Sequence, residues 1–259
     1  MRALVTGGSG ALGRATCVAL AARGHSVAVG WHTQAARAGE VASEIGRAGG
    51  AALPVHLDVT DAASTERAVA EAARALGGLD VLVHAAAVNA DGLIADLDPA
   101  DVSTMFAVHV TGAMVVCRAA LPWLLESGRG RIVLFSSVLA SRSNTGVAGY
   151  ASAKGAVEAL TRSLAVELGP KRITVNAVAP GYISAGLGLA PLAAAGRNVR
   201  ALVPARRAGT PEEVAAVVAF LASDAASYVN GSILPVDGGL LAGARLQADS
   251  PDLAGAGRA

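Results

Sequence analysis

The first fifteen residues, MRALVTGGSGALGRA (1–15), decide the fold class. A short apolar run leads straight into the glycine-rich stretch TGGSGALG (6–13), and a helical pattern follows it. Small residues at Gly8, Gly10 and Gly13 allow the backbone to turn tightly and to approach a pyrophosphate, and the start of a helix attracts negative charge. The spacing therefore predicts a phosphate-binding loop, with an ordinary tight strand-to-helix turn as the alternative.

Apolar runs alternate with helical patterns along the rest of the chain. After RALVT (2–6), the strand-like runs are SVAVG (26–30), ALPVHL (52–57), LDVLVHA (79–85), GRIVLFSS (130–137), ITVNAVAP (173–180) and SILPVDG (232–238). Helical patterns occupy residues 33–49, 61–76, 98–127 and 210–223. Nearly continuous apolar strands separated by helices are typical of a parallel sheet covered on both faces. We therefore predict an α/β fold in three layers (α/β/α), with a Rossmann-type, doubly wound parallel sheet of seven strands.

Length and composition indicate one domain and exclude some partners. A chain of 259 residues, of which 53% are hydrophobic and 16% charged, is long enough for one substantial core. The most apolar long window contains His109, Arg118 and Pro122, so we expect no membrane span. A net charge of +1 gives no electrostatic footprint for nucleic acid, which we do not expect as a partner.

The predicted domain covers residues 1–240, and residues 241–259 are predicted to form a loosely ordered tail. Residues 186–207, rich in Gly, Ala and Pro, are predicted to form a lid over the substrate. Cys17 and Cys117 fit core positions without the spacing of a zinc or redox motif, so we predict no metal site. No charged leader with an apolar core precedes the glycine loop, and we expect a cytoplasmic protein.

The stretch SSVLASRSNTGVAGYASAK (136–154) carries the predicted chemistry. Tyr150 and Lys154 are four residues apart, so on a helix they share one face. A lysine ammonium near a phenol favours the phenolate and lowers a pKa that is about 10 in the free side chain. Ser137, at the end of the fifth strand, can donate a hydrogen bond to a substrate oxygen on which negative charge develops.

The residues after the second strand indicate which nicotinamide cofactor would bind. A site for NAD places Asp or Glu about 20 residues beyond the loop, where the carboxylate accepts from the ribose 2′-hydroxyl. This chain has no acidic residue there before Glu40, whereas Arg14, His32 and Arg37 could meet a 2′-phosphate. We predict NADP(H), the alternative being that these are merely solvated basic residues.

Over residues 3–240 the chain resembles the short-chain dehydrogenase/reductase family. The resemblance rests on the glycine loop, the Ser137 and Y-x-x-x-K constellation, VNAVAPGY (175–182) and LPVDGG (234–239). The single-domain branch usually carries T-G-x-x-x-G-x-G, and Ala11 departs from that pattern. The loop also fits T-G-x-x-G-x-x-G, as in the longer members, and is similar to the loop of polyketide ketoreductase domains.

The resemblance implies the roles of individual residues. The expected cofactor-binding residues are Thr6, Gly7, Ser9, Gly10, Ala11, Leu12, Gly13, Trp31, His32, Thr33, Asp58, Val59, Ala85, Ala86, Ala87, Tyr150, Lys154, Pro180, Gly181, Ile183 and Ser184. The expected substrate contacts are Ser137, Leu139, Tyr150 and Tyr182. Tyr150 would protonate the substrate oxygen during reduction, and Lys154 would also hold the nicotinamide ribose. HAAA (84–87) occupies the place of the family's N-N-A-G, and Ser184 could replace a Thr that binds the carboxamide.

His109, in FAVHVTG (106–112), aligns with a catalytic Asn of the family. We predict that it takes part in catalysis by relaying protons or holding a water molecule, since an imidazole can carry a proton. The alternative is a buried histidine with a purely structural role.

The resemblance implies an NADPH-dependent ketoreductase, similar to 3-oxoacyl-acyl-carrier-protein reductases and polyketide ketoreductases. The substrate would be a small-molecule ketone or a thioester on an acyl carrier protein, for which Arg129 and Lys171 match carrier contacts of fatty-acid reductases. We also expect a homotetramer or homodimer. Two alternatives stay open: a dehydrogenase of a small alcohol, sugar or steroid, and a catalytically silent NADP(H)-binding sensor.

Overall fold

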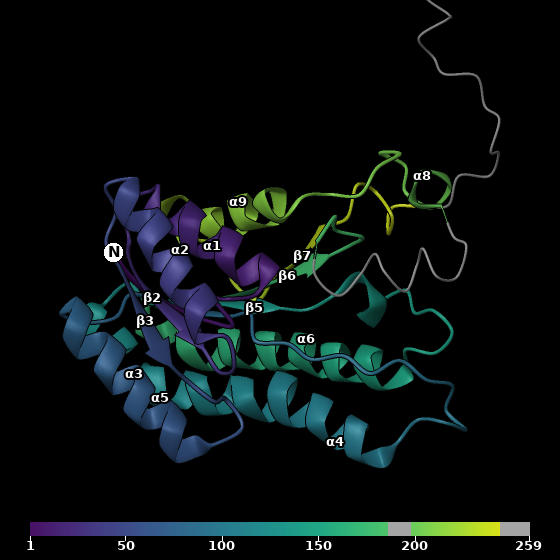
Figure 1. Cartoon of the computed structure of the whole chain (residues 1–259), viewed down its shortest axis with the longest axis horizontal. Helices are drawn as coiled ribbons and strands as arrows, with labels where there is room; N and C mark the ends of the chain where they lie inside the picture. Colours follow the sequence, from purple (N-terminus) through teal and green to yellow (C-terminus); the bar gives the residue numbers. More distant parts are fainter. Residues whose placement is uncertain (186–197, 244–259) are drawn as a thin grey trace, which may run out of the picture.

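The computed structural model describes residues 1–185 and 198–243 (Figure 1). Seven parallel strands form one sheet, in the spatial order β3-β2-β1-β4-β5-β6-β7. They are β1 (Arg2–Thr6), β2 (Ser26–Trp31), β3 (Ala52–His56), β4 (Val81–His84), β5 (Arg131–Phe135), β6 (Thr174–Pro180) and β7 (Ile233–Val236). The predicted doubly wound, seven-stranded sheet is confirmed.

Helices cover both faces of the sheet (Figure 1). One layer contains α1 (Ala11–Ala21), α2 (Ala35–Arg47) and α9 (Pro211–Leu221); the other contains α3 (Ala62–Leu76), α4 (Pro99–Phe106), α5 (Gly112–Ser127) and α6 (Ala148–Leu168). Strand side chains alternate between the two layers. In β1, Ala3 and Val5 belong to the core under the first layer, and Leu4 belongs to the core under the second. Both faces are therefore apolar, which explains the continuous hydrophobic strands.

Short elements complete the description. A π-helix (Ala107–Thr111) joins α4 to α5, and α8 (Val199–Leu202) precedes α9. Among the described residues, the other short helices are 3₁₀ turns at Val138–Ala140, Gly169–Lys171 and Asp224–Ala226. Cys17 in α1 and Cys117 in α5 are free thiols, each buried in a different helical layer.

The run from Pro99 to Ser127 is long and apolar enough to cross a membrane by length and composition. In the structure, 44% of its most apolar stretch is buried inside the fold. Val116, Ala120 and Leu124 are fully buried in the core, and α5 packs against α3. We assign this run as a core helix of the α/β fold.

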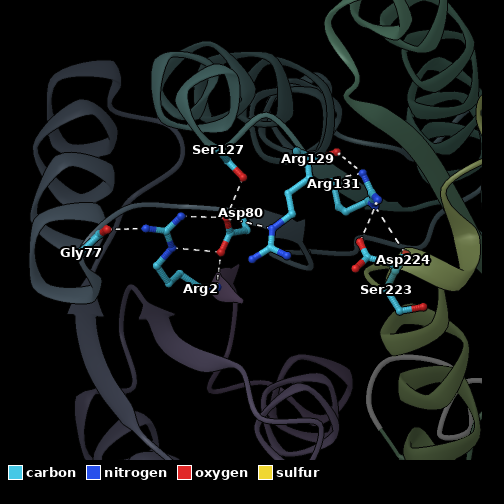
Figure 2. Close-up of polar contacts among 9 residues, drawn as sticks. Arg2, Gly77, Asp80, Ser127, Arg129, Arg131, Ser223 and Asp224 are labelled. Atoms are coloured by element: carbon cyan, nitrogen blue, oxygen red, sulfur yellow. Dashed lines mark hydrogen bonds and ion pairs between the residues drawn. The ribbon is translucent and has the colours of Figure 1, made fainter.

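A polar cluster lies at the edge of the sheet where the strands begin (Figure 2). Asp80 is almost completely buried and accepts from the backbone N and Nη2 of Arg2, each at 2.8 Å, and from Ser127 Oγ at 2.6 Å. Burial alone raises the pKa of Asp80, but these hydrogen bonds outweigh burial and hold its pKa well below the ordinary value. Arg131 is also buried, with Nη2 3.3 Å from Asp224 Oδ1, and Arg129 Nε lies 3.9 Å from Asp80 Oδ1. The cluster ties the starts of β1, β4 and β5 together.

The predicted lid falls partly outside the described residues, which exclude 186–197. In its remaining part, Val203 packs with Val138 and Leu240 in a small separate core. Of the predicted tail, only residues 241–243 are described.

Candidate active site

A cavity of about 940 Å³ lies at the edge where the parallel strands end. It is lined by the loops that follow β1, β2, β3, β4, β5 and β6, in agreement with the rule that open α/β sheets bind ligands at the carboxyl ends of their strands. The predicted residues on its wall are Gly7, Ser9, Gly10, Ala11, Leu12, Gly13, His32, Thr33, Asp58, Val59, Ala85, Ala86, Ala87, Ser137, Leu139, Tyr150, Lys154, Pro180, Gly181, Tyr182 and Ile183. Within the described residues, Thr6, Trp31, His109 and Ser184 do not reach the wall.

The glycine loop has the geometry that a phosphate cradle requires. Gly7 has a φ of +63°, and a Cβ there would lie 2.8 Å from the carbonyl oxygen of Ala85. A Cβ at Gly13 would collide with the Gly7 carbonyl. Gly10 is the N-cap of α1. Among the described residues, no side chain caps this helix, and its first turn contains no acidic residue. The free backbone N–H groups of that turn are available to an anion, and the side chain of Ala11 lies on the cavity wall.

At the adenosine end, the structure separates the three basic candidates. Arg14 Nη2 binds both carboxylate oxygens of Glu44, at 2.9 and 2.7 Å, and is not among the described cavity residues. The guanidinium of Arg14 is thus paired with another helix and lies off the described cavity wall, and its contact with a 2′-phosphate stays a prediction. His32 and Arg37 do line the cavity, and His32 Nε2 lies 3.5 Å from Asp58 Oδ2.

Thr6 and His84 hold the wall of the cavity from behind. His84 Nε2 lies 3.2 Å from the carbonyl oxygen of Val108; because a carbonyl only accepts, Nε2 carries the proton. His84 Nδ1 then accepts from Thr6 Oγ1 at 3.0 Å, and Thr6 Oγ1 accepts from the N–H of Ala86 at 3.2 Å. Burial, and then the nearby Lys154, lower the pKa of His84 to about 4, so the ring is neutral. This chain of hydrogen bonds fixes the loop after β4.

Ser137, Tyr150 and Lys154 come together at the cavity, from the end of β5 and from α6. The Ser137 hydroxyl lies close enough to the Tyr150 hydroxyl to lower the pKa of Tyr150, and Lys154 Nζ lies 5.4 Å from the centre of the Tyr150 ring. Lys154 Nζ also donates to the carbonyl oxygen of Phe135 at 2.7 Å. This Ser, Tyr and Lys arrangement suits proton transfer to a substrate oxygen.

The expected lowering of the Tyr150 pKa is not found. Burial raises the pKa of Tyr150 to about 12, the hydrogen bond with Ser137 opposes this, and the charge of Asp91 adds to it. Burial also lowers the pKa of Lys154 to about 7, so its positive charge is incomplete at neutral pH. The prediction was wrong because it considered the attraction between the two groups and not the cost of burying both.

His109 lies behind Tyr150 on the π-helix. Its ring meets the Tyr150 ring edge to face, with centres 5.5 Å apart and planes at 89°. Nε2 lies 2.7 Å from the carbonyl oxygen of Val88, and Nδ1 is buried without a partner among the described residues. Burial, and then Lys154, lower the pKa of His109 to about 3, so the ring is neutral. His109 thus contacts a catalytic candidate directly, and its relay role stays a prediction.

Two other predicted cofactor residues point elsewhere. Trp31 packs edge to face on His56, with ring centres 4.7 Å apart. Ile183 forms an isolated bridge with Gly209, and in extended backbone successive side chains point to opposite sides. Ile183 and Ala185 therefore both reach the cavity wall, and Ser184 does not.

Several loops on the cavity wall, at both its adenosine end and its substrate end, were not predicted from the sequence. The residues on the wall that were not predicted are Leu57, Thr60, Gln34, Val88, Asn89, Asp91, Thr104, Val108, Phe135, Ser136, Val138, Asn144, Thr145, Gly146, Val147 and Ala185. Asn144 Nδ2 donates to Tyr182 Oη at 3.2 Å, and Asn89 Nδ2 donates to Asp91 Oδ1 at 2.9 Å. The polar residues that follow the apolar stretch 85–88, just after β4, were the signal that could have found Asn89 and Asp91.

Comparisons with known proteins agree with this geometry. A family model described as enoyl-(acyl carrier protein) reductase matches residues 8–241. The chain is 35% identical to a 3-oxoacyl-[acyl-carrier-protein] reductase of Synechocystis sp., over 92% of this chain and 96% of that protein. It is 40% identical to a cyclohexanol dehydrogenase of Rhodococcus sp., over 92% of this chain and 95% of that protein. A crystal structure of a putative short-chain alcohol dehydrogenase from Sinorhizobium meliloti superposes with a TM-score of 0.88 at 33% identity, covering 93% of this chain and 96% of the other.

Proposed function

This chain belongs to the short-chain dehydrogenase/reductase family, an oxidoreductase family that acts on alcohol and carbonyl groups, and on that basis we propose that it reduces a ketone with NADPH. The observation that carries the proposal is the convergence of Ser137, Tyr150 and Lys154 on one cavity that also holds a phosphate cradle. A catalytically silent sensor would have no need of that convergence.

The chain's own residues supply and direct the proton. When bound, a nicotinamide cofactor supplies the hydride that the carbonyl carbon accepts. The Tyr150 hydroxyl gives its proton to the carbonyl oxygen, and Ser137 is near enough to donate to the same oxygen as negative charge develops there. A pKa of about 12 keeps Tyr150 protonated at neutral pH, which is the state that proton donation requires. Lys154 lies beside the Tyr150 ring, and its pKa of about 7 lets it exchange a proton near neutral pH.

The charge at the adenosine end supports NADPH over NADH. Arg37 and His32 line that part of the cavity, and Arg37 is exposed. A guanidinium attracts the 2′-phosphate that NADPH has and NADH lacks. Among the described residues, Asp58 is the acidic residue on this part of the wall. Its Oδ1 accepts a hydrogen bond from Thr60 Oγ1 at 2.7 Å, and the carboxylate lies beside His32.

A thioester on an acyl carrier protein is the substrate suggested by the similarity to 3-oxoacyl-[acyl-carrier-protein] reductase. Carrier docking is tested with Arg129→Glu combined with Lys171→Glu. The double variant should raise KM for a carrier-bound 3-oxoacyl substrate, more so at low salt, and leave KM for a short soluble thioester unchanged. Equal effects on both substrates would remove the carrier protein from the proposal.

A second candidate is a dehydrogenase of a small alcohol. The similarity to cyclohexanol dehydrogenase favours it. A structural observation also favours it: Arg129 lies in the polar cluster at the start of β5, at the edge opposite the cavity, and is next to Asp80.

We further propose that the enzyme is a cytoplasmic homodimer or homotetramer.

The direct test is a spectrophotometric panel. Purified protein is mixed with NADPH and a set of ketones and 3-oxo thioesters, and with NADP⁺ and the matching alcohols, and absorbance at 340 nm is followed. The proposal expects turnover in the reducing direction to exceed turnover in the oxidising direction at neutral pH. If the protein binds the cofactor but turns over no substrate in either direction, the function is that of the catalytically silent sensor.

A further inference from the structure

The substrate end of the cavity contains one carboxylate among the described residues, that of Asp91. Asp91 lies in the loop after β4, and this carboxylate lines the same cavity as Ser137 and Tyr150. The other acidic residue on the described wall, Asp58, lies at the adenosine end beside His32. Among the described residues, Asp91 is therefore the one that can present a negative charge to a substrate held at Tyr150.

The Asp91 carboxylate is held in place by its own loop. Asn89 Nδ2 donates to Asp91 Oδ1 at 2.9 Å. The next residue, Gly92, donates its N–H to the carbonyl oxygen of Gly146 at 2.9 Å, which ties this loop to the segment just before α6. Because α6 carries Tyr150, the carboxylate is positioned relative to the reacting hydroxyl.

The charge of Asp91 is not neutralised within the described residues. No lysine, arginine or histidine there forms an ion pair with it, whereas Asp58 and Asp80 each have a basic partner. The carboxylate is also near enough to act on Tyr150, since it contributes to the raised pKa of the phenol. An unpaired carboxylate can accept hydrogen bonds and cannot donate any.

We propose that Asp91 is a specificity-determining residue, which selects ketones carrying a hydroxyl or ammonium group and disfavours ketones carrying a free carboxylate. The donor group on the substrate would give its hydrogen bond to Asp91 while the carbonyl oxygen receives the proton of Tyr150. This inference rests on the proposed ketone reduction and adds the chemical class of the substrate. The selectivity has an attractive and a repulsive part, and the repulsive part excludes anionic analogues of similar shape.

Four ring ketones of similar size test the inference: 4-aminocyclohexanone, 4-hydroxycyclohexanone, 4-methylcyclohexanone and 4-oxocyclohexanecarboxylate. We measure kcat/KM for each with NADPH at neutral pH and low salt. The native protein should prefer the ammonium ketone to the carboxylate ketone by on the order of tenfold, as expected for one partly solvated charge acting on two substrates of opposite sign. The hydroxyl ketone should rank above the methyl ketone.

Asp91→Asn keeps the shape of the side chain and removes its charge. In this variant the preference for the ammonium ketone over the carboxylate ketone should fall to about twofold or less. The matched control is Asp96→Asn, which removes an exposed carboxylate of the same loop that is absent from the described cavity wall. The control should keep the native preference. A native preference below twofold, or the same preference in Asp91→Asn as in the native protein, overturns the inference.

Binding gives a readout that does not depend on turnover. The four ketones are titrated by calorimetry into Tyr150→Phe with NADPH bound, with and without Asp91→Asn. If the affinity order follows charge and Asp91→Asn removes it, the inference stands even when no ketone is reduced, and only the proposed reaction fails. Equal or undetectable binding of all four ketones overturns the inference itself.

Discussion

Tyr150 and Lys154 respond in opposite ways to the same burial. The phenol is the neutral form of its side chain and is stabilised, whereas the ammonium is the charged form and is destabilised. The pair therefore consists of a protonated acid and a lysine that exchanges its proton near neutral pH. That combination suits a step in which Tyr150 loses a proton and then recovers it.

Tyr150→Phe removes the hydroxyl and keeps the ring that packs against His109. We expect kcat to fall at least about 100-fold, because general acid catalysis contributes that much or more, while NADPH affinity stays near the native value. Stopped-flow turnover and a fluorescence titration of NADPH measure the two quantities. Tyr228→Phe, at a fully exposed tyrosine, is the control and should have no effect. Retention of a tenth of the native rate in Tyr150→Phe would contradict the mechanism.

His32→Asp places a carboxylate at the adenosine end, where it can accept from a ribose 2′-hydroxyl and repel a 2′-phosphate. The ratio of kcat/KM for NADPH to that for NADH should fall by about tenfold or more, which corresponds to about 1.4 kcal/mol. Arg14→Ala is the matched control: Arg14 is paired with Glu44, so the ratio should not change. An unchanged ratio in His32→Asp would show that charge at this position does not select the cofactor.

The β1 strand, the glycine loop and α1 could be predicted from the sequence because each depends on local physical requirements. A strand buried on both faces is mostly apolar, and Ala3, Leu4 and Val5 are completely buried. A loop that approaches another backbone cannot carry side chains at its closest points, and Gly7 and Gly13 are those points. The spacing of Tyr150 and Lys154 predicted that they share a face if they lie on a helix, and both do lie on α6.

Gly13→Ala tests the loop. The added Cβ would collide with the Gly7 carbonyl, and we expect the loop to shift and NADPH affinity to fall more than tenfold. Gly46→Ala in α2 is the control, since nothing lies within 4 Å of a Cβ there, and it should raise the free energy of unfolding by about 0.5–1 kcal/mol. Fluorescence titration and chemical denaturation measure the two effects. Native NADPH affinity in Gly13→Ala would mean that phosphates bind elsewhere.

The loops after β4 and before α6 could not be predicted in the same way. Asn89, Asp91 and Asn144 reach the cavity because two irregular segments pack together, joined by the hydrogen bond from Gly92 N–H to the carbonyl oxygen of Gly146. No periodic pattern in the sequence predicts a contact of this kind. Ser184 was misplaced for a related reason: the local bridge between Ile183 and Gly209 decides which side chains face inward. The opposite pKa shifts of Tyr150 and Lys154 required knowledge of burial, which spacing does not give.

On the scale of the whole molecule, the polar cluster around Asp80 and the cavity lie at opposite ends of the parallel strands. The starts of the strands are joined by Asp80, Arg2 and Ser127 (Figure 2). The cavity lies at the other ends of the strands. Two neutral imidazoles, those of His84 and His109, lie in the interior between the strand ends and the π-helix. Their burial makes the stability of the fold depend on pH.

His109→Asn should reduce that dependence. The pKa of His109 is about 3 in the folded protein and about 6.5 in an unfolded chain, so the unfolded chain binds more protons between these values. Stability is then fully present above pH 6.5 and is lost as pH falls, by on the order of a few kcal/mol for each such histidine. Denaturation at pH 7.5 and at pH 4.5 should show a smaller loss for His109→Asn than for the native protein. Identical losses would mean that His109 does not stay neutral in the fold.

Restoring the family's usual residue should also preserve turnover. His109→Asn is expected to keep activity at neutral pH because an amide can donate to the Val88 carbonyl as the imidazole does. His109→Leu removes that donor, and its rate reports whether a polar group behind Tyr150 is needed. Full activity in His109→Leu would give His109 a purely structural role.

The two cysteines of the chain are hidden from reagents in solution. Cys17 and Cys117 are buried in opposite helical layers; burial raises the pKa of Cys117 to about 12 and that of Cys17 well above its ordinary value. A thiolate is the reactive form, so a maleimide dye should leave the folded native protein unlabelled. A cysteine introduced by Asp96→Cys would then be the single labelling position, and a fluorophore there would report when the loop that carries Asp91 responds to a substrate.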